Sequence, residues 1–152
     1  MKQGIALICG LLLASLAACG DRGEPGAGGS EEATGGTARA EEAAVDAAQA
    51  WLELVDSGNY GESWEEAAAY FRGAVAKEEH VHSLEAVRAP LGELVSRELA
   101  TKGYHTALPG VPDGRYVVAQ FRASFAGKQE ALETVTAMLD SDEWRVAGYY
   151  IK

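Results

Sequence analysis

The chain has 152 residues, of which 47% are hydrophobic and 24% are charged. This length suits one globular domain with short extensions and excludes a large multidomain enzyme. Its 23 acidic and 13 basic residues give a formal net charge of −10, which excludes nucleic acid as the main partner because phosphate backbones require a basic surface.

The N-terminal segment has the features of an export signal. Lys2 supplies a basic start, and the apolar run over residues 4–18 contains no charged residue. The run is shorter than the roughly 20 residues that a membrane-spanning helix needs. A basic start, a short apolar run and small residues at its end therefore predict a secretory signal peptide over residues 1–18.

Residues 16–19 read LAAC and resemble the lipobox of bacterial lipoproteins, in which a peptidase cuts just before an acylated Cys. The resemblance implies that Cys19 becomes the mature N-terminus and carries acyl chains such as palmitate, since stable anchoring requires several chains. An ordinary signal peptide that happens to end in Cys is the alternative. The next residue is Gly20, whereas Asp directly after the Cys typically retains such lipoproteins at the inner membrane. In a Gram-negative host, the resemblance thus implies an outer-membrane anchor facing the periplasm.

Cysteine chemistry is excluded from the folded part of the chain. Cys9 lies inside the predicted signal peptide, and Cys19 is the predicted lipid site. With no other Cys in the sequence, disulfides, thiolate catalysis and Cys-ligated zinc are ruled out.

Residues 19–37 are predicted to form the lipidated Cys and a flexible tether. Gly is frequent in this segment, and Leu, Ile, Val and aromatic residues are absent from it, so it has too little apolar surface to offset the entropy of ordering. A Gly-rich chain of this length reaches about 20–25 Å. The remaining residues, 38–152, are predicted to form a single domain.

The first half of this domain is predicted to be helical. A helical apolar stripe runs through residues 44–55 and is followed by Gly58, a suitable helix stop. A second helix is expected to place Trp64, Ala67, Ala68 and Phe71 on one face. A third is expected over residues 77–88, with Val81, Leu84 and Val87 facing inward, and Pro90 prevents its continuation.

The second half changes to the period of a β-strand. Residues 116–125 alternate, with Val117, Ala119, Phe121 and Phe125 on one face, and strands are also expected over residues 132–139 and 144–151. The segment 92–108 suits either a helix or a strand, and we favour a strand because a dense turn signal follows it. The predicted fold class is therefore α+β, with three N-terminal helices packed on a curved antiparallel sheet of about four strands.

A family resemblance is carried by residues 50–52, 55–58, 63–64, 88–92, 97, 108–110, 112–114, 116–118, 133–136, 144–146 and 148–151. On these segments the domain resembles the bacterial family called domain of unknown function 4019. The resemblance implies a sheet wrapped around a helix, as in a cystatin-like or NTF2-like cone, and implies no activity. The sequence departs from the family pattern at His80 and its neighbour Glu79, where an aromatic such as Trp is expected, and in the hairpin 140–143, which lacks the usual Gly.

Candidate chemistry is sparse. His80 and His82 are two residues apart and point to different sides of a helix, so a solvated helix surface is predicted there in place of a metal site, and no metal or cofactor is predicted. Neither a phosphate-binding loop nor a Ser nucleophile elbow is present. Cone-shaped folds can house isomerases that use a carboxylate and a Tyr, and the residues that would then act are Asp46, Glu53, Glu133, Tyr104, Tyr116 and Tyr150. Their spacing selects no pair, so no catalytic residue is predicted.

Aromatic residues are the other candidates for a site. Tyr149 and the Tyr and Trp residues of the domain either line a ligand cavity or pack the interface between helices and sheet. The residues chosen as pocket-lining candidates are Trp51, Trp64, Tyr104, Tyr116 and Tyr150.

Charge is unevenly distributed between the two halves of the domain. Residues 39–88 carry 11 acidic and 4 basic side chains, whereas residues 89–152 carry 8 and 7. The near-neutral sheet side is therefore predicted to face the membrane or a partner, although an acidic helix face that merely keeps the protein soluble accounts equally for the difference.

Two functions remain open. The first is a membrane-anchored envelope lipoprotein whose non-catalytic domain binds a small apolar ligand or an envelope protein, with a homodimer through the open sheet face as one arrangement. The second is an isomerase-like or hydrolytic enzyme that uses the cone pocket. An enzyme requires a deep pocket that contains a carboxylate with a shifted pKa, whereas a binding module requires only an apolar pocket or patch.

Overall fold

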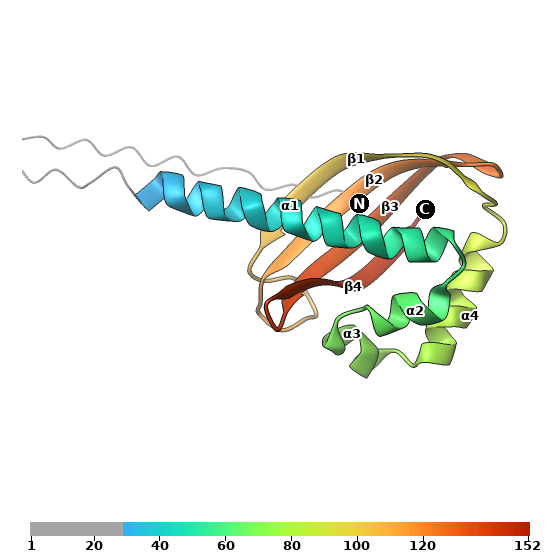
Figure 1. The fold of residues 1–152 in the computed structure, drawn as a ribbon, viewed down its shortest axis with the longest axis horizontal. Coiled ribbons are helices and arrows are strands. Elements are labelled where there is room, and N and C mark those ends of the chain that lie inside the picture. Colours follow the sequence, from blue (N-terminus) through green and yellow to red (C-terminus); the bar gives the residue numbers. More distant parts are fainter. Residues whose placement is uncertain (1–28) are drawn as a thin grey trace, which may run out of the picture.

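The computed structural model describes residues 29–152 (Figure 1). The predicted signal peptide 1–18, Cys19 and the first part of the tether lie outside the described residues. Helices come first and strands follow, so the α+β expectation is confirmed. The elements in the described range are α1 (Gly29–Asp56), α2 (Tyr60–Glu65), α3 (Ala69–Ala74), α4 (Lys77–Arg88), β1 (Leu94–His105), β2 (Tyr116–Phe125), β3 (Lys128–Asp140) and β4 (Glu143–Ile151).

The strands form one open antiparallel sheet in the order β1-β2-β3-β4. The segment that suited either helix or strand is β1, which confirms the strand assignment. Register shifts interrupt all three strand pairs, and the β1–β2 pair has two such shifts, both along β1. Such bulges bend a strand and increase its twist, and the sheet curves over α1 in Figure 1.

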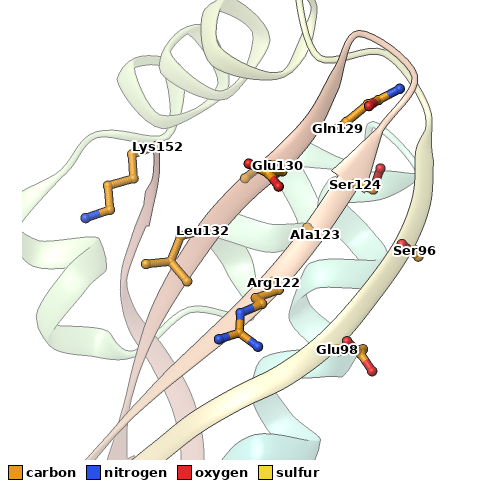
Figure 2. A pocket seen from close by; sticks show the side chains of 10 residues that line it. Ser96, Glu98, Arg122, Ala123, Ser124, Gln129, Glu130, Leu132 and Lys152 are labelled. Carbon is orange, nitrogen blue, oxygen red and sulfur yellow. The ribbon is translucent and has the colours of Figure 1, made fainter.

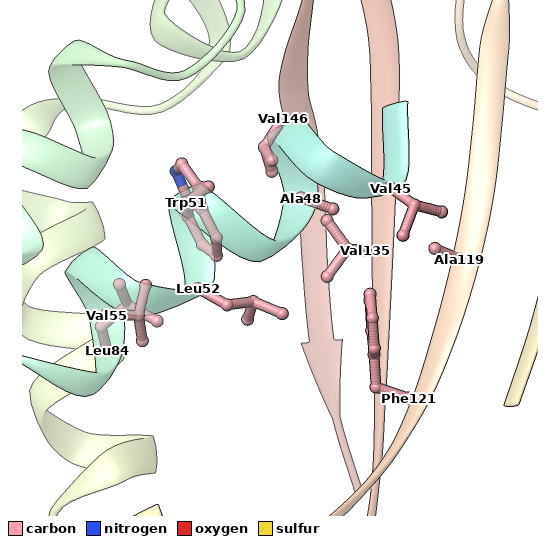
Figure 3. Packing of buried hydrophobic residues seen from close by; sticks show 10 residues of the cluster. All are labelled: Val45, Ala48, Trp51, Leu52, Val55, Leu84, Ala119, Phe121, Val135 and Val146. Atoms are coloured by element: carbon pink, nitrogen blue, oxygen red, sulfur yellow. The ribbon is translucent and has the colours of Figure 1, made fainter. Parts of the chain in front are cut away.

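The main core lies between α1 and the sheet (Figure 3). The stripe predicted for α1 is buried, with Ala48 and Leu52 fully inaccessible. These residues meet Phe121 of β2 and Val135 of β3, which are also fully buried. The alternation predicted for β2 is confirmed as well, because its odd-numbered residues 117–125 are all buried.

The start of α1 differs from the expected domain boundary. The helix begins at Gly29, so residues 29–37, assigned by the sequence to the tether, belong to it. Once its packed part has formed, a helix extends by one hydrogen bond for each added residue, and this extension outweighs the cost of Gly35 and Gly36. At the other end, Gly58 has φ +76°, and its N–H and that of Asn59 donate to carbonyls of the last turn, which is a Schellman cap.

The second predicted helix is wrong, because the structure divides it into α2 and α3. The division occurs at Ala67 and Ala68, both fully buried. Ala68 adopts an extended conformation, and its N–H donates to the Val146 carbonyl of β4 at 2.8 Å. A tertiary hydrogen bond to the sheet edge thus replaces the continuation of the helix, and the described range contains four helices where three were expected.

The orientation of α4 also differs from the prediction. Val87 was expected to face inward but is 43% exposed, whereas His80, expected on a solvated surface, is only 5% exposed. The buried residues of α4 are His80, Leu84 and Arg88, spaced by one helical turn. This rotation follows from the partners that Arg88 finds in the interior.

The hairpin between β3 and β4 is closed by two residues with positive φ, Ser141 at 53° and Asp142 at 72°. Positive φ at both central positions is the geometry of a type I′ turn, and the second of these positions is normally a Gly. The turn forms without Gly and therefore stores strain at Asp142.

Candidate functional site

Five ionisable side chains from five elements meet beside the core. Asp56 comes from the end of α1 and Arg88 from the end of α4, while Arg97, Glu133 and Tyr149 come from β1, β3 and β4. We refer to these five residues as the ion-pair network. Their elements are far apart in sequence, so the network exists only in the folded chain.

Each carboxylate of the network contacts both arginines. Glu133 is fully buried and accepts bonds from Arg88 Nη1 at 3.1 Å, from Arg97 Nε at 2.6 Å and Nη2 at 3.2 Å, and from the Tyr149 hydroxyl at 2.7 Å. Asp56 accepts from Arg88 Nη2 at 2.5 Å and from Arg97 Nη1 and Nη2 at 2.6 and 3.0 Å. Two positive charges therefore balance two negative ones within a closed set of hydrogen bonds.

The electrostatic consequences follow from burial and from these bonds. Burial by itself lowers the pKa of Arg97, but its bonds to Asp56 and Glu133 more than offset this and raise it. Burial and the neighbouring Glu133 carboxylate raise the pKa of Tyr149, so its phenol stays neutral and donates to Glu133. Arg88 also lies over the Phe125 ring, 4.6 Å from its centroid, a favourable cation–π position.

This arrangement suits a structural role better than a chemical one. A catalytic carboxylate must reach substrate and exchange a proton, whereas Glu133 is inaccessible and is saturated by two arginines and a phenol. The network instead ties the ends of α1 and α4 to three strands. Of its members, the sequence named Glu133 as a catalytic candidate and Tyr149 as a cavity candidate. It missed Asp56, Arg88 and Arg97 as partners, although all five lie in the segments that carry the family resemblance.

The other catalytic candidates do not join Glu133. Asp46 and Glu53 are exposed on α1. Tyr116 is 1% exposed, and its hydroxyl donates to the Pro112 carbonyl at 2.6 Å, whereas Tyr150 is 63% exposed.

The predicted pocket-lining aromatics do not converge on one cavity. Trp51 is buried, and its indole N–H donates to the Ser63 carbonyl at 2.7 Å. Trp64 is half-buried and donates to the Val75 carbonyl at 2.8 Å. Tyr104 packs beside α1 with Val117, and Tyr116 is in the core. Only Tyr150, among these five, contacts the groove between α4 and β4.

A buried Ser–His contact is a further feature that the sequence did not reveal. The Ser63 Oγ lies 2.9 Å from His80 Nε2, and the same Oγ donates to the Tyr60 carbonyl at 2.8 Å. His80 packs against Phe71 edge to face, with ring centroids 5.4 Å apart, and against Trp51 at 6.1 Å. The imidazole thus occupies the place where the family pattern led us to expect an aromatic. Ser63 is fully buried, so no substrate reaches its hydroxyl.

A hollow of about 770 Å³ lies on the face of the sheet opposite the helices (Figure 2). Charges of both signs line it, from Glu98 and Glu130 and from Arg122 and Lys152. These side chains are exposed, as expected for the solvated face of an antiparallel sheet. The hollow therefore has no buried polar group that would define a ligand.

Residues 29–152 hold neither a metal-binding cluster nor a membrane-spanning helix. No group of three or more His, Cys, Asp or Glu side chains in this range is placed to hold a metal ion. None of the helices in the same range is long and apolar enough to cross a membrane.

Comparison with known proteins places the chain in a family without assigning an activity. No match was found among curated proteins or among solved structures. The family profile described as protein of unknown function DUF4019 matches residues 47–149, a range that includes all five members of the ion-pair network. The chain belongs to the DUF4019 family.

Proposed function

We propose that the protein is an exported bacterial lipoprotein, anchored through acyl chains on Cys19, whose domain binds a small apolar ligand or an envelope protein without catalysis. In a Gram-negative host the anchor lies in the outer membrane and the domain faces the periplasm. The LAAC segment at residues 16–19 and the short uncharged run before it support the anchor.

One observation carries the non-catalytic part of the proposal. Glu133, the fully buried carboxylate of residues 29–152, is already neutralised by Arg88 and Arg97. The enzyme alternative requires an accessible acid or base, and neither this carboxylate nor the buried Ser63 hydroxyl meets that requirement.

We also infer that the fold is a variant of the cystatin-like or NTF2-like cone. The long helix α1 lies along one face of a four-stranded antiparallel sheet (Figure 1), and the bulges supply the bending that a cone requires. The interior that would form a cone pocket is filled by Trp51, Leu52 and Phe121. Ligands are therefore expected at the surface of the domain, outside its core.

Mass spectrometry of the protein extracted from membranes tests the anchor. The expected mass corresponds to a chain that begins at Cys19 and carries acyl chains, and Cys19→Ser should abolish both the processing and the acylation. The variant Gly20→Asp should move the protein from the outer to the inner membrane in a density gradient. A soluble, unacylated wild-type protein would refute the anchor. Native mass spectrometry of the same protein then tests for a bound molecule and for a homodimer.

A further inference from the structure

A groove beside the ion-pair network lies between the helices and the last strand, and Tyr149 belongs to both. Its volume is about 340 Å³, within the range of small-molecule sites. Phe71 and Val75 form one end, residues 79–87 of α4 form one wall, and residues 149–151 of β4 form the other. Most of the lining side chains are apolar or aromatic, and Val87 is 43% exposed there.

His80, a nearly buried residue, lines this groove and supplies a hydrogen-bond acceptor. The hydroxyl of Ser63 donates to the Tyr60 carbonyl, so it can bond His80 only by accepting a hydrogen bond from the Nε2–H group. The imidazole is therefore protonated at Nε2, and Nδ1 carries a lone pair. Burial lowers the pKa of His80, which keeps the ring neutral.

The Nδ1 atom of His80 has no partner within residues 29–152, although the side chain is only 5% exposed. No buried side-chain nitrogen or oxygen in this range lacks a hydrogen bond, so Nδ1 must reach the accessible surface. His80 lines the groove, and a neutral imidazole offers one ring nitrogen as a hydrogen-bond acceptor.

Charge restricts the molecules that fit. Glu79 is the single charged side chain that lines the groove, and its carboxylate stands without an ion pair in the described range. A carboxylate and a neutral imidazole acceptor repel anions and attract hydrogen-bond donors, above all cationic ones. The acidic character of residues 39–88 extends this preference over the whole helical side.

We propose that this groove binds an apolar molecule that carries a protonated amine. The ammonium group donates to His80 Nδ1 and to the Glu79 carboxylate, and the apolar body lies against Leu84, Val87 and Ile151. This assignment rests on the proposed binding function and names the ligand class and site for it.

Nuclear magnetic resonance titration of the purified full chain tests the proposal, with 2-phenylethylamine as the probe. The amine should shift the Nδ1 resonance of His80 and the amide resonances of Val87 and Ile151. Phenylacetate, which has the same ring and the opposite charge, should not do so. Equal binding of the two probes, or shifts confined to the outer-face hollow around Glu98 and Arg122, would overturn the assignment.

Two variants and one control separate the contacts. Glu79→Gln should weaken amine binding about two- to fivefold, the range expected for one exposed ion pair. His80→Phe keeps a ring against Trp51 and removes the acceptor, and should weaken binding about tenfold. The control Glu130→Gln, on the outer face, should leave the affinity unchanged.

The outcomes distinguish this assignment from the proposed function. Unchanged amine affinity in both Glu79→Gln and His80→Phe would overturn the groove site while leaving the acylated mass of Cys19 as it was. An unacylated chain that still binds the amine would overturn the lipoprotein and leave the groove intact.

Discussion

Replacement of Glu133 by Gln should destabilise the fold strongly, although the two side chains have nearly the same shape. In the native protein the network holds two arginines and two carboxylates, all at most 18% exposed. Glu133→Gln leaves a net charge of +1 among them. It also turns an amide N–H₂ toward guanidinium donors where a carboxylate oxygen accepted bonds. We expect a loss of about 3–5 kcal/mol, the usual cost of removing one partner from a buried ion pair.

Urea unfolding followed by circular dichroism measures this loss. Glu130→Gln, on the same strand but exposed, is the matched control and should change stability by less than about 0.5 kcal/mol. The double variant Glu133→Gln with Arg97→Gln restores neutrality and should recover part of the loss, with a coupling energy of about 1–3 kcal/mol. Arg88 then retains Asp56 as its partner.

A Glu133→Gln protein as stable as the control would refute this reasoning, because it would mean that water or side-chain movement neutralises the site at little cost. Purely additive losses in the double variant would show that Glu133 and Arg97 do not act as a pair.

Three further expectations concern stability. Burial lowers the pKa of His80 in the folded state, so at pH values below the ordinary histidine pKa of 6.5 the unfolded chain binds more protons than the folded chain. The unfolding free energy should therefore fall as the pH drops below that value. His80→Phe should flatten this dependence in urea titrations from pH 7 to 5. Asp142→Gly relieves a positive φ in the β3–β4 turn and should raise stability by about 1 kcal/mol; an unchanged midpoint would show that the turn is unstrained. Gly127→Ala should destabilise, because its Cβ would lie 2.5 Å from the Pro90 carbonyl oxygen. In helix α3, a Cβ at Gly73 would have no neighbour within 4 Å, so Gly73→Ala should raise the unfolding free energy by about 0.5–1 kcal/mol in urea unfolding. Equal effects of Gly127→Ala and Gly73→Ala would contradict the close approach of Gly127 to Pro90.

Local patterns account for the parts of the fold that the sequence predicted. The α1 stripe repeats at the helical period, and β2 alternates, because each element buries one face of a regular backbone. Gly58 ends α1 because glycine readily adopts the positive φ that this helix cap requires. The segment that became β1 was ambiguous, because its apolar residues suit both periods until a neighbouring strand pairs with it.

The candidate site was less predictable, since it depends on residues that no local pattern connects. Arg88 and Val87 are adjacent in sequence, and hydrophobicity alone favours Val87 for the interior. The structure buries Arg88 because two carboxylates from α1 and β3 meet it there. His80 is buried for a similar reason, since the Ser63 hydroxyl oxygen accepts a hydrogen bond from its ring and Phe71 packs against it.

The sequence by itself determined that helices precede strands, the class of the fold and the buried faces of α1 and β2, and it is the source of the expectation that Cys19 is acylated. These features follow from periodicity, backbone conformation and short motifs, which act over a few residues. Only the tertiary structure decided that α2 and α3 separate at Ala68, that α4 turns Arg88 and His80 inward, and that five distant residues form one network. Those outcomes depend on long-range hydrogen bonds and ion pairs, whose partners become neighbours only when the sheet and helices assemble.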